Sequence, residues 1–201
     1  MARPRRSENT RIALLQLGVE LLAEHGYSGT GLKQILDAAK VPKGSFYNYF
    51  ASKEAFVAEV IEFYMQNLLE IFDGMVANSN LTPLQTIQQI YTVFAEHLLQ
   101  QGCGHGCLMG SLAGEVGGTS ELCRQAMQKM YSQWHQRFSA VIDRAQQAGE
   151  VRDDLSAVTL TDIFWNQWEG AMLRMQFETS AEPLLQSLDM TLNRLFKPLA
   201  A

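Results

Sequence analysis

Apolar residues recur at helical spacing along almost the whole chain of 201 residues, and this periodicity constrains the possible folds more than any other feature. Leu15, Val19 and Leu22 lie three or four positions apart near the N-terminus. Phe164 and Trp168 show the same spacing towards the other end, whereas the alternation that is typical of strands is almost absent. The sequence therefore predicts an all-α protein with about nine helices and no sheet.

Capping residues divide this periodic pattern into separate helices. A serine, threonine or proline opens most of them, and a glycine or an X-Pro pair ends several. The expected helices run from Ser7 to Gly26, from Thr30 to Lys40, from Pro42 to Tyr49, from Ser52 onward, from Pro83 to Gln101, over 107–116, from Thr119 or Ser120 to Gly149, from Ser156 onward, and from Pro183 to Phe196.

The whole chain has a formal net charge of -5, but this charge is distributed unevenly along the sequence. Residues 1–56 contain 8 Lys and Arg against 5 Asp and Glu, a net of +3, and residues 57–201 contain 8 against 16, a net of -8. A basic N-terminal part on an acidic body is typical of a small polyanion-binding module joined to a part with another task. Charged residues are also scarce, at 18%, which favours an oligomer that covers part of its surface.

The cysteines and the N-terminus indicate the compartment. Cys103, Cys107 and Cys123 are too few for a disulfide framework and favour a reducing cytosol. Arginines precede the first apolar stretch, but Glu20 and Glu24 interrupt it, so we expect an amphipathic helix and not a signal peptide. No other run approaches about 18 uninterrupted apolar residues, so we expect a cytoplasmic protein without a membrane span.

Residues 30–53, TGLKQILDAAKVPKGSFYNYFASK, predict two short helices separated by a tight break at Lys40 to Pro42. This is helix-turn-helix geometry, in which the second helix enters the major groove of double-stranded DNA. Phe46 and Phe50 are expected to face the domain core. The alternative, a helical hairpin with a solvated basic face, leaves the polar and aromatic residues beside Lys43 unexplained. The groups expected to contact DNA are Lys43, Gly44, Ser45, Tyr47, Asn48 and Tyr49, with a phosphate contact from Lys53 and a loose arm of Arg3, Arg5 and Arg6.

The stretch VPKGSFYNYFASKEAF closely resembles the DNA-reading element of TetR-family repressors, and the helix layout agrees over the whole chain. Pro42 departs from the family pattern, because many members have a capping Ser or Thr there. The resemblance implies a three-helix helix-turn-helix DNA-binding domain over 1–52 and a helical ligand-binding and dimerisation domain over 53–201. It also implies a repressor that binds a pseudo-palindromic operator as a homodimer, and it adds Lys33 to the expected DNA contacts.

A glycine-rich stretch, residues 102–118, contains Cys107 and is expected to include a weak helix over 107–116. Cys107 is expected in the first turn of that helix, where the helix dipole favours the thiolate, and the alternative is an inert buried thiol. The segment GCLMGSLAGEV resembles electrophile-responsive members of the family that have a cysteine at this position, and FWNQWEGAMLRMQFE resembles an acrylate-responsive one. The resemblance implies a sensor of electrophiles such as quinones, reactive aldehydes or acrylate-like acids.

The resemblance also places an effector site in the helical body and a dimer interface at its end. The last two helices, 156–177 and 183–197, are expected to pair with those of a second copy. Core packing explains each effector candidate better than a ligand contact does when the residue is taken alone. In addition to Cys107, the effector candidates are Phe63, Phe94, Tyr131, Trp134, Phe164 and Trp168, with Glu169 and Arg174 as polar anchors. The apolar interface candidates are Leu160, Met172, Leu188, Leu192 and Leu195.

Three other interpretations stay open at this point. Cys103, His105 and Cys107 spell C-x-H-x-C, and Cys123 or His97 could complete a metal site, which would make the protein a metal-responsive regulator. A non-covalent small-molecule sensor is the second alternative. The remote third alternative is an all-helical enzyme or carrier, but the chain contains no metal-protease motif, phosphate loop or nucleophile elbow. We therefore expect neither enzymatic activity nor a cofactor.

Overall fold

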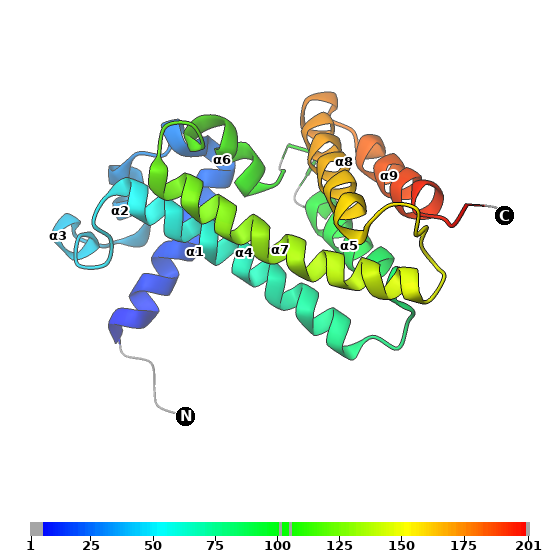
Figure 1. The fold of residues 1–201 in the computed structure, drawn as a ribbon. Coiled ribbons are helices and arrows are strands. Elements are labelled where there is room, and N and C mark those ends of the chain that lie inside the picture. Colours follow the sequence, from blue (N-terminus) through cyan, green and yellow to red (C-terminus); the bar gives the residue numbers. More distant parts are fainter. Residues whose placement is uncertain (1–5, 101, 105, 200–201) are drawn as a thin grey trace. The chain divides into compact units, whose positions relative to one another are not determined.

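The computed structural model describes residues 6–100, 102–104 and 106–199, and within these ranges the chain is helical and has no strand (Figure 1). The all-α class and the approximate number of helices are thereby confirmed. Among the described helices, none is both long and apolar enough to cross a membrane. The helices are α1 (Arg6–Gly29), α2 (Leu32–Ala39), α3 (Lys43–Phe46), α4 (Lys53–Asn78), α5 (Pro83–Gln100), α6 (Leu108–Val116), α7 (Glu121–Gln147), α8 (Ala157–Glu178) and α9 (Glu182–Leu188), which continues into the π-helical turn η1 (Asp189–Leu195).

Packing divides the chain into two compact units, each of which is discontinuous in sequence. The first contains the residues up to Asn67 together with Leu108–Met130, and the second contains Leu68–Cys107 together with the residues from Tyr131 onward. Since α4 and α7 cross these boundaries, both helices contribute to both units. The functional division predicted between residues 52 and 53 stays a prediction, and packing places α6 and the start of α7 with the N-terminal helices.

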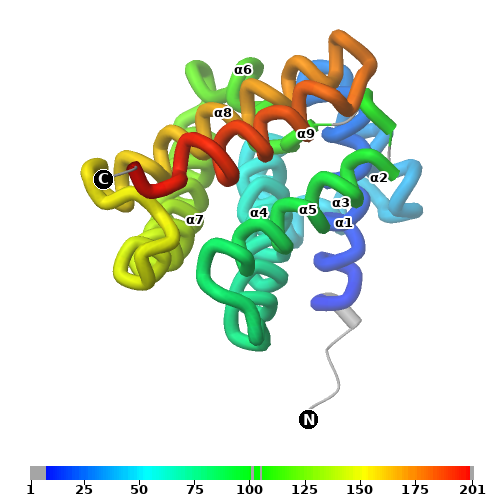
Figure 2. Tube along the Cα trace, turned by 90° about the vertical axis from the view of Figure 1, so that its right-hand side faces the viewer, coloured from blue at the N-terminus to red at the C-terminus, as the bar shows by residue number. Residues whose placement is uncertain are grey.

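In the first unit, α1, α2 and α4 bury the apolar stripes that the sequence predicted, and α6 packs against α1. Leu14, Leu22 and Ile35 are fully buried. In the second unit, α8 and α9 lie side by side, as Figure 2 shows, and α9 also contacts α5. The buried stripe of α8 includes Leu160 and Phe164.

Most of the predicted caps are present. The Ser52 hydroxyl accepts from the backbone N–H of Ala55 at 3.0 Å, and the Ser156 hydroxyl accepts from that of Thr159 at 3.1 Å. Gly149 has a positive φ of 72° and follows the end of α7. These positions are where local sequence signals and the structure agree most closely.

Three helix boundaries differ from the prediction. Gly26 has a positive φ of 66°, as expected, but the helix continues beyond this kink to Gly29. α3 ends at Phe46 and not at Tyr49, because the backbone hydrogen bonds of Asn48 and Tyr49 go to residues three positions earlier. Cys107 lies directly before the first residue of α6 and not within its first turn.

The predicted dimer interface stays a prediction, but three of the residues assigned to it are buried within the chain. Leu160, Met172 and Leu192 lie in the chain's own core, with exposed fractions of 0%, 3% and 2%. The large apolar side chains of the last helices that do face outward, besides the predicted Leu195, are Val158, Leu173 and Phe177 of α8, Leu185 of α9 and Met190 of η1.

Candidate nucleic-acid interface and sensing site

The tight break between α2 and α3 depends on two backbone conformations. Lys40 ends α2 in the left-handed region, with φ 54° and ψ 38°. The backbone N–H groups of Lys40 and Val41 donate to the carbonyls of Asp37 and Leu36, so the end of α2 is capped. Pro42 is extended, with φ -61° and ψ 145°, and directs the chain into α3. The predicted helix-turn-helix break is therefore present.

Three aromatic rings anchor α3 to the rest of the first unit. Phe46 and Phe50 are buried, as the sequence predicted, and both contact Phe56 of α4. The ring centroids of Phe46 and Phe56 are 5.4 Å apart, and those of Phe50 and Phe56 are 4.9 Å apart with nearly perpendicular planes. This anchoring holds one side of the α3 segment inward and leaves the other side for solvent.

The outward side of the α2–α3 segment contains most of the predicted DNA-contacting residues. Lys33, Lys43, Gly44 and Asn48 are exposed, and Tyr47 is 47% exposed. Ser45 and Tyr49 are half-buried. A hypothetical β-carbon on Gly44 would meet no atom within 4 Å, so the backbone there is open to a close approach. Arg5 lies outside the described residues, as does Arg3, and Arg6 is the first residue of α1.

Lys53 differs from the other predicted contacts because its ammonium group is already bound within the protein. The Nζ atom donates to the carbonyl of Tyr27 at 2.6 Å and lies 4.0 Å from the centroid of the Tyr27 ring. Burial lowers the pKa of Lys53, and the nearby Glu115 carboxylate opposes that change. A phosphate at this position would have to compete with the Tyr27 carbonyl for the Lys53 ammonium group, or share that group with it.

Glu115, a residue that the sequence reasoning missed, connects α6 to the end of α1. Its carboxylate accepts from the backbone N–H groups of Tyr27 and Ser28, each at 2.9 Å. The hydrogen bond from Ser28 contributes most to lowering the pKa of Glu115. The Gly26 kink makes room for this carboxylate, because a β-carbon there would lie 2.3 Å from Oε1.

In the second unit, the predicted effector residues gather around Tyr91 of α5, which the sequence reasoning did not single out. The Tyr91 ring centroid lies 4.5 Å from that of Phe164 and 4.9 Å from that of Trp168. Its hydroxyl accepts from the indole N–H of Trp134 at 2.9 Å. Burial raises the pKa of Tyr91 far above its ordinary value, so the phenol is neutral. Tyr91 resembled an ordinary core residue in the sequence, and no local signal marks it.

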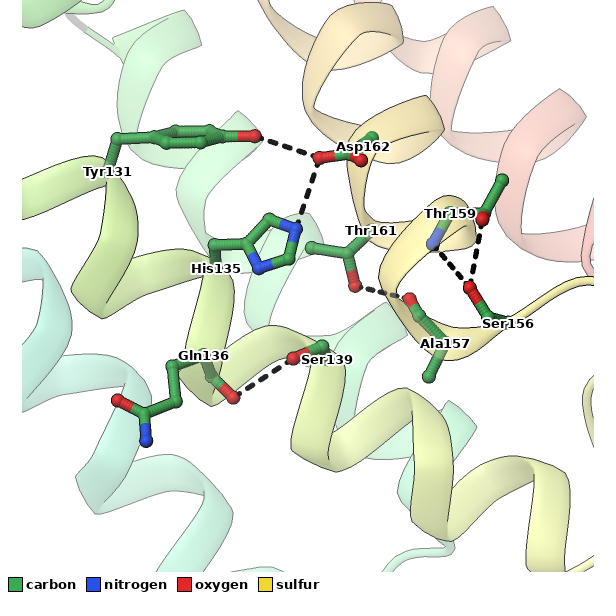
Figure 3. Close-up of polar contacts among 9 residues, drawn as sticks. All are labelled: Tyr131, His135, Gln136, Ser139, Ser156, Ala157, Thr159, Thr161 and Asp162. Atoms are coloured by element: carbon green, nitrogen blue, oxygen red, sulfur yellow. Dashed lines mark hydrogen bonds and ion pairs between the residues drawn. The ribbon is translucent and has the colours of Figure 1, made fainter. Parts of the chain in front are cut away.

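Phe94 and Tyr131 lie at the margin of this aromatic cluster. The ring centroids of Phe94 and Tyr91 are 5.6 Å apart, and Phe94 is half-buried. The Tyr131 hydroxyl donates to Asp162 at 3.0 Å, and the Nε2 atom of His135 lies 3.1 Å from the same carboxylate oxygen (Figure 3). Burial, together with the hydrogen bond and charge of Asp162, raises the pKa of Tyr131 to about 12. The Tyr131 hydroxyl thus joins α7 to α8.

Cys107 and Glu169 meet in the second unit. Cys107 is 9% exposed as a residue, and its thiol hydrogen-bonds to the carboxyl group of Glu169, on α8. Burial raises the pKa of Glu169 to about 7, and the hydrogen bond from the thiol acts in the opposite direction. The predicted sensor cysteine and one of its predicted polar anchors are therefore in contact. The other anchor, Arg174, forms an exposed ion pair with Glu178 at 2.8 Å.

The remaining thiols show no pairing or metal cluster within the described residues. None of the three cysteines forms a disulfide bond, and the Cys123 thiol donates to the backbone carbonyl of Glu54 at 3.8 Å. Among the residues that the structure places, no group of three His, Cys, Asp or Glu side chains could hold a metal ion. His105 lies outside the described residues, so the complete C-x-H-x-C triplet is not among them.

Two family descriptions match the chain. Residues 14–60 match "Bacterial regulatory proteins, tetR family", and residues 83–190 match "Tetracyclin repressor-like, C-terminal domain". The first match contains the α2–α3 segment, and the second contains both Cys107 and Glu169.

Several known proteins are similar over nearly their whole length. The HTH-type transcriptional repressor DhaR of Mycobacterium sp. (strain GP1) is 34% identical over 90% of each chain. The transcriptional regulator AcuR of Cereibacter sphaeroides is 35% identical over 96% of this chain and 90% of its own. The HTH-type transcriptional repressor NemR of Escherichia coli is 33% identical over 94% of this chain and 96% of its own.

Solved structures agree with these matches. A regulatory protein TetR from Rhodobacter sphaeroides superimposes with a TM-score of 0.85 at 35% identity, covering 93% of this chain and 98% of its own. The reduced form of Escherichia coli NemR superimposes with a TM-score of 0.81 at 28% identity, covering 92% of this chain and 96% of its own.

Proposed function

The chain belongs to the TetR family of bacterial regulatory proteins, and we propose that it is a transcriptional repressor which binds a pseudo-palindromic DNA operator as a homodimer. A small electrophile or ligand that acts near Cys107 releases it from the operator. DNA binding belongs to residues 1–52 in this proposal, and sensing and dimerisation belong to residues 53–201. The relatives named as repressors support the sign of control.

One observation carries the DNA-binding part of the proposal: α3 is anchored by buried phenylalanines on one side and presents polar groups on the other. Tyr47 and Asn48 read base edges in the major groove, and Lys43 contacts phosphate. The further contacts are those of Arg5, Arg6, Lys33, Gly44, Ser45, Tyr49 and Lys53.

The DNA-binding test uses fluorescence anisotropy on DNA that flanks the protein's own gene. Tyr47→Ala should weaken operator binding without changing the oligomeric state. Lys43→Ala should weaken binding to all sequences and lower the slope of log affinity against log salt by about 2 per dimer, since each phosphate contact contributes about 0.9. Lys129→Ala, which breaks an exposed ion pair with Glu62, is the matched control. Wild-type affinity in both the Tyr47 and Lys43 variants, together with a wild-type salt slope in the Lys43 variant, would refute this interface.

The homodimer is proposed to form through α8, α9 and η1. Phe177 and Leu173 are 69% and 60% exposed, which is unusual for large apolar side chains in a lone folded chain. Phe177→Arg should produce monomers in sedimentation experiments and abolish tight operator binding, because both half-sites must be held at once. Leu122→Arg, which alters an exposed leucine on α7, is the control. If the variant that combines Phe177→Arg and Leu173→Arg is still a dimer, the interface does not lie on this face.

The sensing step is proposed to start at Cys107, because this thiol directly precedes α6 and contacts a carboxyl group inside the second unit. A change at Cys107 displaces α6, which packs on α1 and holds the end of α1 through Glu115. The displacement swings α4 and alters the separation of the two reading helices, so that operator affinity falls by a population shift. Phe94, Tyr131, Trp134, Phe164, Trp168 and Glu169 form the surroundings of the effector.

The sensing test compares release from the operator by N-ethylmaleimide and by acrylate. Cys107→Ser should abolish release by N-ethylmaleimide, and Cys103→Ser should respond as the wild type does. If Cys107→Ser responds normally, covalent sensing at this thiol is wrong, and a non-covalent ligand becomes the better explanation. Release of the wild type by a divalent metal ion would instead support a metal-responsive regulator.

A further inference from the structure

The buried carboxyl group of Glu169 lacks a full set of hydrogen-bond partners. Its Oε1 atom is inaccessible to solvent, and no described residue hydrogen-bonds to it. A buried carboxylate is costly unless it is paired or hydrogen-bonded. The aromatic cluster explains neither the presence of an acid here nor the contact that this acid makes with a thiol.

The face of α8 that contains Glu169 lies against the segment containing Cys107 at two points. Glu169 and Gln176 are seven residues apart and therefore share one face of the helix. Gln176 lies against Gly106, where a β-carbon would be 2.5 Å from Nε2, and Glu169 hydrogen-bonds to the thiol of the next residue. Because Gly106 has no side chain, α8 can approach the backbone beside Cys107 this closely.

We propose that Glu169 accepts the thiol proton of Cys107 when the sulfur attacks an α,β-unsaturated carbonyl compound, so that the two residues act as one sensing pair. This inference rests on the proposed function of Cys107 as the sensor. It assigns to Glu169 a chemical role in the modification of the thiol, in addition to lining the proposed effector site.

The reaction balances without an oxidant or a metal ion. The sulfur forms a bond to the β-carbon, and the electrons of the carbon–carbon double bond move to the α-carbon. The proton passes from sulfur to the Glu169 carboxylate and then to the α-carbon. The product is a thioether, and the carboxylate returns to its starting state.

Removing the Glu169 carboxylate should change the rate of Cys107 alkylation, and the direction of that change separates a proton-accepting role from a purely electrostatic one. A fixed negative charge beside a thiol disfavours the thiolate, so removing a bystander carboxylate would speed alkylation. Removing a proton acceptor slows it instead, typically by 10²-fold or more for a well-placed base. Two titratable groups, the Cys107 thiol and the Tyr91 phenol of α5, interact electrostatically with Glu169, and the phenol stays neutral through the working pH range.

The test measures the second-order rate constant for alkylation of Cys107 by N-ethylmaleimide and by acrylamide, using peptide masses, between pH 5 and pH 9 in the full-length protein. The wild-type rate should rise with a midpoint near pH 7, where the pKa of Glu169 lies, and then level off. In Glu169→Gln, Cys107 should be alkylated about 10²-fold more slowly at pH 7.5, and the plot of rate against pH should show no plateau near neutrality. Glu178→Gln removes an exposed carboxylate from the same helix and should behave as the wild type does.

A second variant guards against a folding defect in Glu169→Gln. Glu169→Asp keeps the acid but shortens its reach, and it should retain the plateau at an intermediate rate. The buried Cys123 thiol, at 0% exposure, reports on folding in the same sample, because it should stay unmodified in every folded variant. Equal or faster alkylation of Cys107 in both Glu169→Gln and Glu169→Asp would overturn the proposal.

The two proposals fail in different ways. If fully alkylated protein still binds the operator, release through Cys107 is wrong, whatever the rates show. If alkylated wild type and alkylated Glu169→Gln both leave the operator but their rates are equal, the sensor stands and the proton-accepting role of Glu169 is refuted.

Discussion

Replacing Gly26 by alanine tests the connection between α1 and α6 most directly. Gly26 has φ 66° and ψ -175°, a region that only glycine occupies without strain, and an alanine there costs about 2 kcal/mol. The new β-carbon would also lie 2.3 Å from Oε1 of Glu115, so the carboxylate must leave. Two charge-assisted hydrogen bonds to Tyr27 and Ser28 are then lost, worth about 1 kcal/mol together at this exposed position.

The expected total is therefore about 3 kcal/mol of unfolding free energy for Gly26→Ala at pH 7, measured by urea denaturation at a fixed protomer concentration. In a Glu115→Ala background the same substitution should cost only the backbone strain, about 2 kcal/mol. Glu115 has a lowered pKa, so its contribution is present above the ordinary carboxyl pKa and is lost as the pH falls through the lowered value. A cost below about 0.5 kcal/mol, or strictly additive costs in the double variant, would refute the reasoning.

Three further predictions concern the buried groups. Burial raises the pKa of Glu169 from 4.5 to about 7, so the wild type should lose about 3 kcal/mol of stability as the pH rises between these values; thermal melts of Glu169→Gln should lack this loss. Trp134→Phe removes the donor to the Tyr91 hydroxyl and should lower the free energy of unfolding by about 1–3 kcal/mol in urea denaturation. Trp165→Phe, which changes a half-buried tryptophan of α8, should lower it less. Phe50→Ala should cost about 3–5 kcal/mol and abolish operator binding in anisotropy measurements at 37 °C, whereas wild-type binding would show that this ring does not anchor α3.

Local signals predicted the helices well, because caps and breaks act over a few residues. Ser52, Ser156 and Gly149 have the roles expected of them, and the Lys40 to Pro42 break is present. The length of α3 was overestimated because a change from four-residue to three-residue hydrogen bonds after Phe46 leaves no compositional trace.

Contacts between distant parts of the chain were less predictable. Glu115 binds Tyr27 across 88 residues, and the core role of Tyr91 depends on Trp134, 43 residues away. The apolar residues of α8 do not reveal from sequence alone which of them stay exposed: Met172, which we expected at an interface, is buried, whereas Leu173 is exposed. Cys107 and Glu169 were both singled out from sequence, but only the folded chain brings the thiol to the acid.

The discontinuous first unit has a consequence for how the protein is made. Its N-terminal segment is complete once Asn67 has been synthesised, but α6 and the start of α7 belong to the same unit and extend it to Met130. At roughly 5–20 residues per second, the intervening stretch takes about 3–13 seconds to leave the ribosome. During that interval the side of α1 that α6 later covers is exposed on the nascent chain. The support that α6 gives to α1 is therefore complete only after well over half of the chain has been translated.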